Sequence, residues 1–191
     1  MIPEGEKNPY SSFLCALGVP ERYRAVSPSV AIPQAAESWS GDPWALTILG
    51  PAGTGKTWIA VRILCEHWGR QACDGFTRRC LRARFWDVSG AMASMKAEFG
   101  TDRNGETFSS LTETAALVLD DLGAQRETEY TRDQVSLILR HRYNAMLPTI
   151  ITSNATSLSQ LGDQRVASRL SDGIVITLGG SDRRGKRGDR A

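Results

Sequence analysis

The sequence has no long hydrophobic run. Without a stretch of about eighteen or more apolar residues, it predicts no membrane-spanning helix. The first residues, Met1–Glu6, include a proline and two acidic side chains and do not form a secretory signal peptide. We therefore expect a cytoplasmic protein that makes no membrane contact.

Cysteine and histidine are scarce, with four and two residues among 191. The gaps between Cys15, Cys65, Cys73 and Cys80 match neither zinc-finger spacing nor a compact disulfide scaffold. A metal site built from His67 and the last three cysteines stays open as an alternative. Because Cys65 and His67 are two residues apart on a predicted helix, they would not share a face. We expect reduced thiols and no metal bound by cysteine.

A strong charge of one sign is also missing. The formal net charge of +2 is too small to indicate nucleic-acid binding by itself. The chain has 41% hydrophobic and 23% charged residues, which is typical of a globular protein, and it contains no internal repeat. Its length predicts about one domain with a core of its own.

Residues 50–57 read Gly-Pro-Ala-Gly-Thr-Gly-Lys-Thr, which fits the phosphate-binding pattern G-x-x-x-x-G-K-[ST]. An apolar strand is predicted before it at 44–49, and a helix after it at 58–68, ending at Gly69. This order directs the positive end of the helix at bound phosphates. The alternative is a glycine-rich turn that only joins the two elements. The predicted nucleotide contacts are Gly50, Pro51, Ala52, Gly53, Thr54, Gly55, Lys56, Thr57 and Trp58.

Further apolar runs alternate with helical patterns along the rest of the chain. Four more strands are predicted at 83–87, 115–119, 148–152 and 174–178. The predicted helices lie at 89–99 and 131–146, with a short helix or ordered loop at 108–113 and short helices within 13–44. The apolar face of the 131–146 helix comprises Val135, Ile138, Leu139, Arg142 and Met146. This alternation predicts an α/β fold with a five-stranded parallel sheet and helices on both faces.

Two adjacent acids, Asp120 and Asp121, directly follow the 115–119 strand. A nucleotide-hydrolysing site of the Walker type needs one acid near Mg²⁺ and a second group that orients or deprotonates water. We expect Thr57 and Asp120 to hold Mg²⁺, Lys56 to reach the β- and γ-phosphates of ATP, and Asp121 to act on water. The alternative is that the aspartates only cap the following turn.

Several blocks of the sequence, in this order, resemble an AAA+ ATPase of the DnaC/DnaI helicase-loader and IstB-like group. The blocks are Gly18–Tyr23, Gly50–Thr57, Leu119–Gly123, Arg142-Tyr143, Pro148–Asn154, Arg165–Leu170 and Gly179–Arg184. The resemblance implies a P-loop ATPase domain over 18–180. From composition we expect a flexible segment at 1–17 and a basic tail at 181–191. The resemblance also implies assembly into a homo-oligomer when ATP binds.

The same resemblance implies roles for four further residues. Asn154 matches the sensor-1 residue, which holds the attacking water or the γ-phosphate; the alternative is an Asx turn at a strand end. Arg169 matches the arginine finger, which is offered to ATP on a neighbouring subunit. Arg165, one helical turn earlier, would assist it or form a structural ion pair. Arg184, or its neighbour Arg183, would approach the nucleotide as a sensor-2 arginine.

Two parts of the resembled loaders have no counterpart in the sequence. Helicase loaders carry an N-terminal domain that grips the replicative helicase, whereas about forty residues precede the first predicted strand here. The last predicted strand is followed by only the basic tail, so we expect little or no C-terminal helical lid. The sequence thus predicts a bare ATPase core.

A basic cluster beside Phe85 and Trp86 is the predicted contact for single-stranded DNA. Basic and aromatic side chains together can follow a phosphate backbone and stack on bases. The alternative is a solvated loop next to core aromatics. The basic residues are Arg78, Arg79, Arg82 and Arg84.

The leading hypothesis is therefore an ATP-hydrolysing, helicase-loader-like protein of DNA replication that assembles on single-stranded DNA. Its protein partner would be a replicative helicase or another DNA-transaction protein. Three alternatives stay open: an IstB-like transposition helper, a nucleotide-gated interaction module with little turnover, and a P-loop small-molecule kinase. The kinase alternative leaves Asn154 and Arg169 unexplained.

Overall fold

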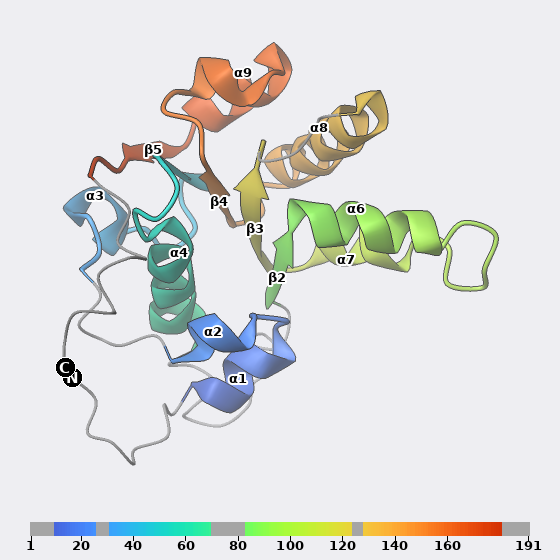
Figure 1. Ribbon diagram of the computed structural model, residues 1–191, viewed down its shortest axis with the longest axis horizontal. Coiled ribbons are helices and arrows are strands. Elements are labelled where there is room, and N and C mark those ends of the chain that lie inside the picture. The colour runs from blue at the N-terminus through green and yellow to red at the C-terminus, as the bar shows by residue number, and fades with distance from the viewer. Residues whose placement is uncertain (1–9, 26–30, 70–82, 124–127, 181–191) are drawn as a thin grey trace.

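The computed structural model describes residues 10–25, 31–69, 83–123 and 128–180 (Figure 1). At its centre is a five-stranded sheet in the order β2-β3-β4-β1-β5, and every strand pair is parallel. The strands are β1 (Ala45–Leu49), β2 (Ala83–Asp87), β3 (Ala116–Leu122), β4 (Thr149–Ser153) and β5 (Ile174–Thr177). The predicted five-stranded parallel sheet is confirmed.

Helices cover both faces of the sheet, also as predicted. One face packs against α1 (Ser11–Ala16), α2 (Glu21–Arg24), α3 (Gln34–Glu37) and α4 (Lys56–Leu64). The other packs against α6 (Val88–Ala97), α7 (Glu106–Glu113), α8 (Glu129–Asn144) and α9 (Gln164–Ser171), and Figure 1 shows α4 and α6 on opposite sides of the strands. Side chains of β3 alternate between the faces, with Val118 in the first core and Leu117 and Leu119 in the second.

The first helix corrects one prediction. Residues 1–17 were expected to be flexible, but α1 places Phe13, Leu14 and Leu17 in the core, each at most 2% exposed. Because these apolar side chains lie on one face of the short helix, burying them stabilises the segment from Tyr10 onward. Residues 1–9 lie outside the described part of the chain.

The helix after the phosphate loop differs from its predicted range. It begins at Lys56, two residues earlier than expected, because Gly55 supplies the left-handed N-cap. The α-helix ends at Leu64 and continues as a π-helical turn, η1 (Cys65–Gly69). The predicted end at Gly69 therefore matches the end of the π-helical turn.

Helix α8 is amphipathic as predicted, with one error at its end. Val135, Ile138 and Leu139 are buried, but Met146 lies beyond the helix with φ of 50° and is 57% exposed. A residue that precedes proline disfavours the helical conformation, so the helix must end before Pro148. Met146 was wrongly assigned to the apolar face.

Arg142 is the one charged residue on that buried face, and it is fully buried. Its Nη1 donates to the carbonyls of Leu111 (3.0 Å) and Thr114 (2.9 Å). Nη2 donates to the Pro148 carbonyl (2.8 Å) and Nε to the Thr149 hydroxyl (2.7 Å). Burial lowers the pKa of Arg142 to about 9, so the guanidinium stays charged at neutral pH. It joins α8 to the end of α7 and to the start of β4.

Neither a membrane span nor a metal cluster occurs in the described ranges. No helix there combines the length and apolar character needed to cross a membrane. No group of three or more His, Cys, Asp or Glu side chains there is placed to hold a metal. Cys15 is an exposed thiol and Cys65 a buried one, whereas Cys73 and Cys80 lie outside the described residues.

Candidate nucleotide-binding site

The loop between β1 and α4 needs glycine at three positions. Gly50, Gly53 and Gly55 have φ of 141°, 79° and 93°, a region that L side chains rarely adopt. At Gly50 the space is also closed, because a Cβ atom would lie 2.4 Å from the carbonyl oxygen of Leu178. The Gly50 N–H donates to the Ala155 carbonyl (2.9 Å). The start of the loop is therefore fixed between the chain segments that follow β4 and β5.

Lys56 lies inside this loop and is 7% exposed. Its Nζ donates to the carbonyls of Gly50 (2.7 Å) and Pro51 (2.8 Å) and to Oδ1 of Asn154 (2.9 Å). The Thr54 hydroxyl also donates to the Pro51 carbonyl (2.9 Å). The ammonium is thus held at the loop, beside the end of β4, where it can balance the charge of an anion.

Asp120 is buried next to the first turn of α4 and is 8% exposed. It accepts hydrogen bonds from the hydroxyls of Thr57 (3.0 and 3.2 Å) and Thr152 (2.6 Å). Burial raises the pKa of Asp120, the two hydroxyls oppose that shift, and the nearby carboxylates of Asp121 and Asp87 add to it. None of the ion pairs among the described residues includes Asp120. The site therefore holds a buried carboxylate that favours the arrival of a cation.

Asp121 lies in a β-bulge and is exposed. The strand was expected to end before the two acids, but β3 continues to Leu122, and its pairing with β4 shifts so that Asp120 and Asp121 both lie opposite Thr152. Asp121 has φ of 63° and is exposed. Its Oδ1 accepts a hydrogen bond from Nδ2 of Asn154 (2.7 Å). One acid thus faces α4 and the other faces solvent.

Five predicted site residues therefore meet at the carboxyl ends of β1, β3 and β4. Asn154 joins Lys56 to Asp121, and Thr57 contacts Asp120. Parallel sheets commonly bind ligands at this edge. Sequence reasoning missed Thr152, whose hydroxyl contacts both acids. The signal for it was a hydroxyl residue near the end of a predicted strand, two positions before Asn154.

Outside the loop, the other predicted residues that the structure describes show no contact with this cluster. Arg165 and Arg169 are on α9, and the Arg169 guanidinium donates to the Arg165 carbonyl (3.2 Å). The Trp58 ring packs edge-on against Tyr23, with 5.4 Å between ring centroids. Arg84 is half-buried in β2. Arg78, Arg79, Arg82 and Arg184 lie outside the described residues.

The donor set fits Mg²⁺. The Thr57 hydroxyl and the Asp120 carboxylate offer adjacent hard oxygen atoms, and no ion pair in the described ranges neutralises that carboxylate. Mg²⁺ is usually bound by one or two protein ligands together with phosphates and water, so a larger protein cluster is not required. These two residues would hold the ion.

Asp120→Asn should stabilise the nucleotide-free protein. Because the folded-state pKa of Asp120 is raised, folding binds its proton more tightly, and stability is lost as pH rises through the window between the unfolded and folded pKa values. At pH 7 the uncharged asparagine side chain does not suffer this loss of stability. We therefore expect Tm to rise by about 2–4 °C, which is the shift that about 1 kcal/mol produces in a domain of this size. Differential scanning calorimetry without Mg²⁺ measures it.

The pH dependence provides the check on this prediction. The difference in Tm between Asp120→Asn and wild type should shrink as pH falls and the wild-type carboxyl becomes protonated. Ser153→Ala is a control, since its hydroxyl donates to the Leu122 carbonyl and carries no charge. A Tm difference that does not change with pH would show that ionisation of Asp120 is not the cause.

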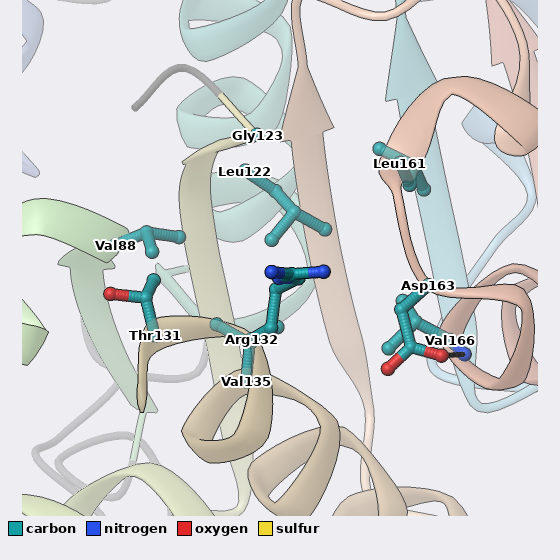
Figure 2. A pocket seen from close by; sticks show the side chains of 9 residues that line it. All are labelled: Val88, Leu122, Gly123, Thr131, Arg132, Val135, Leu161, Asp163 and Val166. Atoms are coloured by element: carbon teal, nitrogen blue, oxygen red, sulfur yellow. Dashed lines mark hydrogen bonds between the residues drawn. The ribbon is translucent and has the colours of Figure 1, made fainter. Parts of the chain in front are cut away.

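A separate pocket of about 400 Å³, including its open mouth, lies beyond the end of β3 (Figure 2). Its lining comes from the segments around β3, α6, α8, η3 (Leu158–Leu161) and α9. Figure 2 shows the Arg132 side chain reaching between Leu122 and Asp163. None of the predicted site residues lines this pocket, so it is distinct from the phosphate loop.

Comparison with known proteins adds a family match and several relatives. The model of the family "IstB-like ATP binding protein" matches residues 31–178. The replicative helicase loader DnaC of Escherichia coli (strain K12) is 26% identical over 141 residues, which cover 72% of this chain and 54% of DnaC. The replicative helicase loader DnaI of Bacillus subtilis (strain 168) is 36% identical over 87 residues, covering 37% of this chain and 28% of DnaI.

A crystal structure of the DnaC helicase loader has a similar fold. It superposes with a TM-score of 0.66 at 23% identity, covering 84% of this chain and 100% of that one. The chain spans about half the length of the curated DnaC relative and less than a third of DnaI.

Proposed function

The chain belongs to the family of IstB-like ATP-binding proteins and has the AAA+ P-loop fold, and we propose that it binds and hydrolyses Mg²⁺-ATP as a helicase-loader-like protein of DNA replication. The observation that carries the proposal is the hydrogen-bonded cluster at the sheet edge. In this cluster Asn154 contacts both Lys56 and Asp121. Thr57 contacts the second acid, Asp120. This is the set that phosphoryl transfer to water requires.

Each residue has a role that its position supports. The loop N–H groups and Lys56 would bind the phosphates, which compete with Asn154 for the ammonium. Mg²⁺ bound by Thr57 and Asp120 would neutralise phosphate charge. Asp121, exposed and oriented by Asn154, would accept a proton from the attacking water. When phosphate takes over the Lys56 ammonium, Oδ1 of Asn154 would lose its donor and become free to accept another hydrogen bond.

Arg169 would complete the site of a neighbouring copy. The packing of α9 supports this, because Val166 and Leu170 are buried and the Trp44 indole donates to the Arg169 carbonyl (3.3 Å). The helix is thus firmly attached, while the guanidinium contacts its own helix at Arg165 and not the cluster formed by Lys56 and its partners. A fixed cation next to developing phosphoryl charge is a large catalytic effect. Hydrolysis would then require assembly into a homo-oligomer.

Single-stranded DNA is the proposed scaffold for that assembly. Phe99, at the end of α6, is 62% exposed, and its ring lies 6.4 Å from that of Tyr130. The Lys96 ammonium lies 5.2 Å from the centre of the Tyr130 ring. An exposed ring near a cation suits base stacking and phosphate contact, and Tyr130 itself is half-buried. Because both curated relatives are replicative helicase loaders, a replicative helicase is the preferred partner over a transposition protein.

Arg169→Ala tests the composite site. We expect the variant to bind ATP within about twofold of wild type but to lose at least about 100-fold of its DNA-stimulated hydrolysis, since an arginine finger contributes about 10³–10⁵ in rate. Phosphate release is measured with and without single-stranded DNA. Arg140→Ala, an exposed arginine on α8, is the control.

A mixture of Lys56→Ala and Arg169→Ala tests whether Arg169 acts on the ATP of a neighbouring copy or on the ATP of its own chain. Lys56→Ala is expected to bind ATP only weakly but retains Arg169, so adding it to Arg169→Ala should restore part of the activity. Full activity of Arg169→Ala alone would contradict the composite site. Tight ATP binding without turnover would favour a nucleotide-gated module, and phosphate transferred to a metabolite would favour a kinase.

A further inference from the structure

Thr152 contacts both acids of the site through a single hydroxyl group. It is in β4 and is 1% exposed. Its Oγ1 donates to Oδ1 of Asp120 (2.6 Å) and accepts the backbone N–H of Asp121 (2.9 Å). A hydroxyl has one proton and two lone pairs, so both contacts can form at once. One side chain therefore links the carboxylate of Asp120 to the backbone of Asp121.

The bulge explains why a hydroxyl is needed at this position. Where β3 has two residues opposite one residue of β4, the regular ladder of backbone hydrogen bonds is interrupted. The Thr152 hydroxyl accepts from the N–H of Asp121 at this interruption. It therefore stabilises the left-handed conformation, φ of 63°, that directs Asp121 toward Asn154.

We propose that Thr152 is a positioning residue that aligns Asp120 for the metal and Asp121 for water at the same time. The inference rests on the proposed ATPase function and extends it to a buried residue that would act through Asp120 and Asp121. Removing the hydroxyl would release the backbone of Asp121 and withdraw one donor from Asp120. Phosphate binding through the loop and Lys56 would stay intact.

Thr47 provides a matched control. It is a fully buried threonine on β1, the strand that pairs with β4. Within the described residues its hydroxyl has no hydrogen-bond partner. Thr47→Val and Thr152→Val thus make the same chemical change on adjacent strands, and only the second removes contacts to the acids.

The experiment compares Thr152→Val, Thr152→Ser and Thr47→Val in the full chain. For Thr152→Val we expect kcat to fall about 10- to 100-fold, the effect of a misplaced catalytic group, while ATP affinity without Mg²⁺ stays within about threefold. Amide hydrogen exchange of Asp121, measured by NMR without nucleotide, should accelerate at least about tenfold. Serine retains the hydroxyl and should restore both values to within about threefold.

The activities of these variants decide whether Thr152 positions the two acids. If Thr152→Val has wild-type kcat, or if Thr47→Val lowers kcat equally, Thr152 has no positioning role. Thr152→Ala is measured in parallel, so that a folded variant without the hydroxyl is available if valine does not fit. A wild-type protein that binds no ATP would refute the proposed function as well, whereas normal wild-type hydrolysis with an unaffected Thr152→Val overturns this inference alone.

Discussion

Lys56→Ala should lower the affinity for Mg²⁺-ATP by about 100-fold or more. Hydrogen bonds to charged groups contribute about 1.5–3 kcal/mol, and 3 kcal/mol corresponds to about 150-fold in a dissociation constant. The ammonium is buried and already held at the loop by Gly50 and Pro51, so little ordering is needed when phosphate binds. Isothermal titration calorimetry with a non-hydrolysable ATP analogue measures the loss.

The variant must retain its fold for this result to be informative. Alanine leaves the carbonyls of Gly50 and Pro51 without the lysine, but Pro51 keeps the Thr54 hydroxyl and is itself exposed to water. Arg140→Ala, an exposed arginine on α8, is the control for loss of a positive charge. Wild-type affinity in Lys56→Ala would falsify the assignment of residues 50–57 as a phosphate loop.

Arg142→Met should destabilise the protein by about 2–4 kcal/mol. Methionine fills much of the volume but loses the hydrogen bonds that the guanidinium donates to the carbonyls of Leu111 and Thr114, at about 1.5–3 kcal/mol for each bond to a charged group. Relief from burying a charge offsets part of that cost. The Pro148 carbonyl keeps a second hydrogen bond from Leu117 and adds little. Urea unfolding measures the change.

Two further variants separate charge from hydrogen bonding. Arg142→Lys retains the charge but offers three donors in a different geometry, so we expect it to recover less than half of the lost stability. Arg140→Met changes an exposed arginine on the same helix and should shift stability by less than about 0.5 kcal/mol. If Arg142→Met were as stable as wild type, the four hydrogen bonds of the guanidinium would contribute no net stability.

Local patterns were sufficient to predict the sheet and most of its helices, although no range was predicted for α9. The phosphate loop has a fixed spacing, and each strand was an apolar run next to a polar or glycine-rich turn. Lys56, Thr57, Asp120 and Asp121 were identified because their chemistry depends on position within such motifs. Sequence could also place Arg142 on a buried face, since it occupies a helical position between apolar residues.

Features that depend on contacts between strands were not predictable. The extension of β3 to Leu122 depends on a bulge that forms only against β4, and the sequence alone shows two acids after an apolar run. The role of Thr152 follows from that same pairing. The end of α8 is a different case, because Met146 fitted the helical period and only the nearby Pro148 signalled that the helix stops earlier.

The left-handed backbone at Asp121 restricts which residues can replace it. Only glycine, asparagine and aspartate adopt this conformation readily, because their side chains are absent or short and polar. Asp121→Asn is therefore a clean test of the carboxylate, since it changes charge without changing backbone preference. Asp121→Glu is not conservative here, although it retains the acid, because it adds backbone strain. For anyone redesigning this site, the fold permits a change of charge more readily than a change of side-chain length.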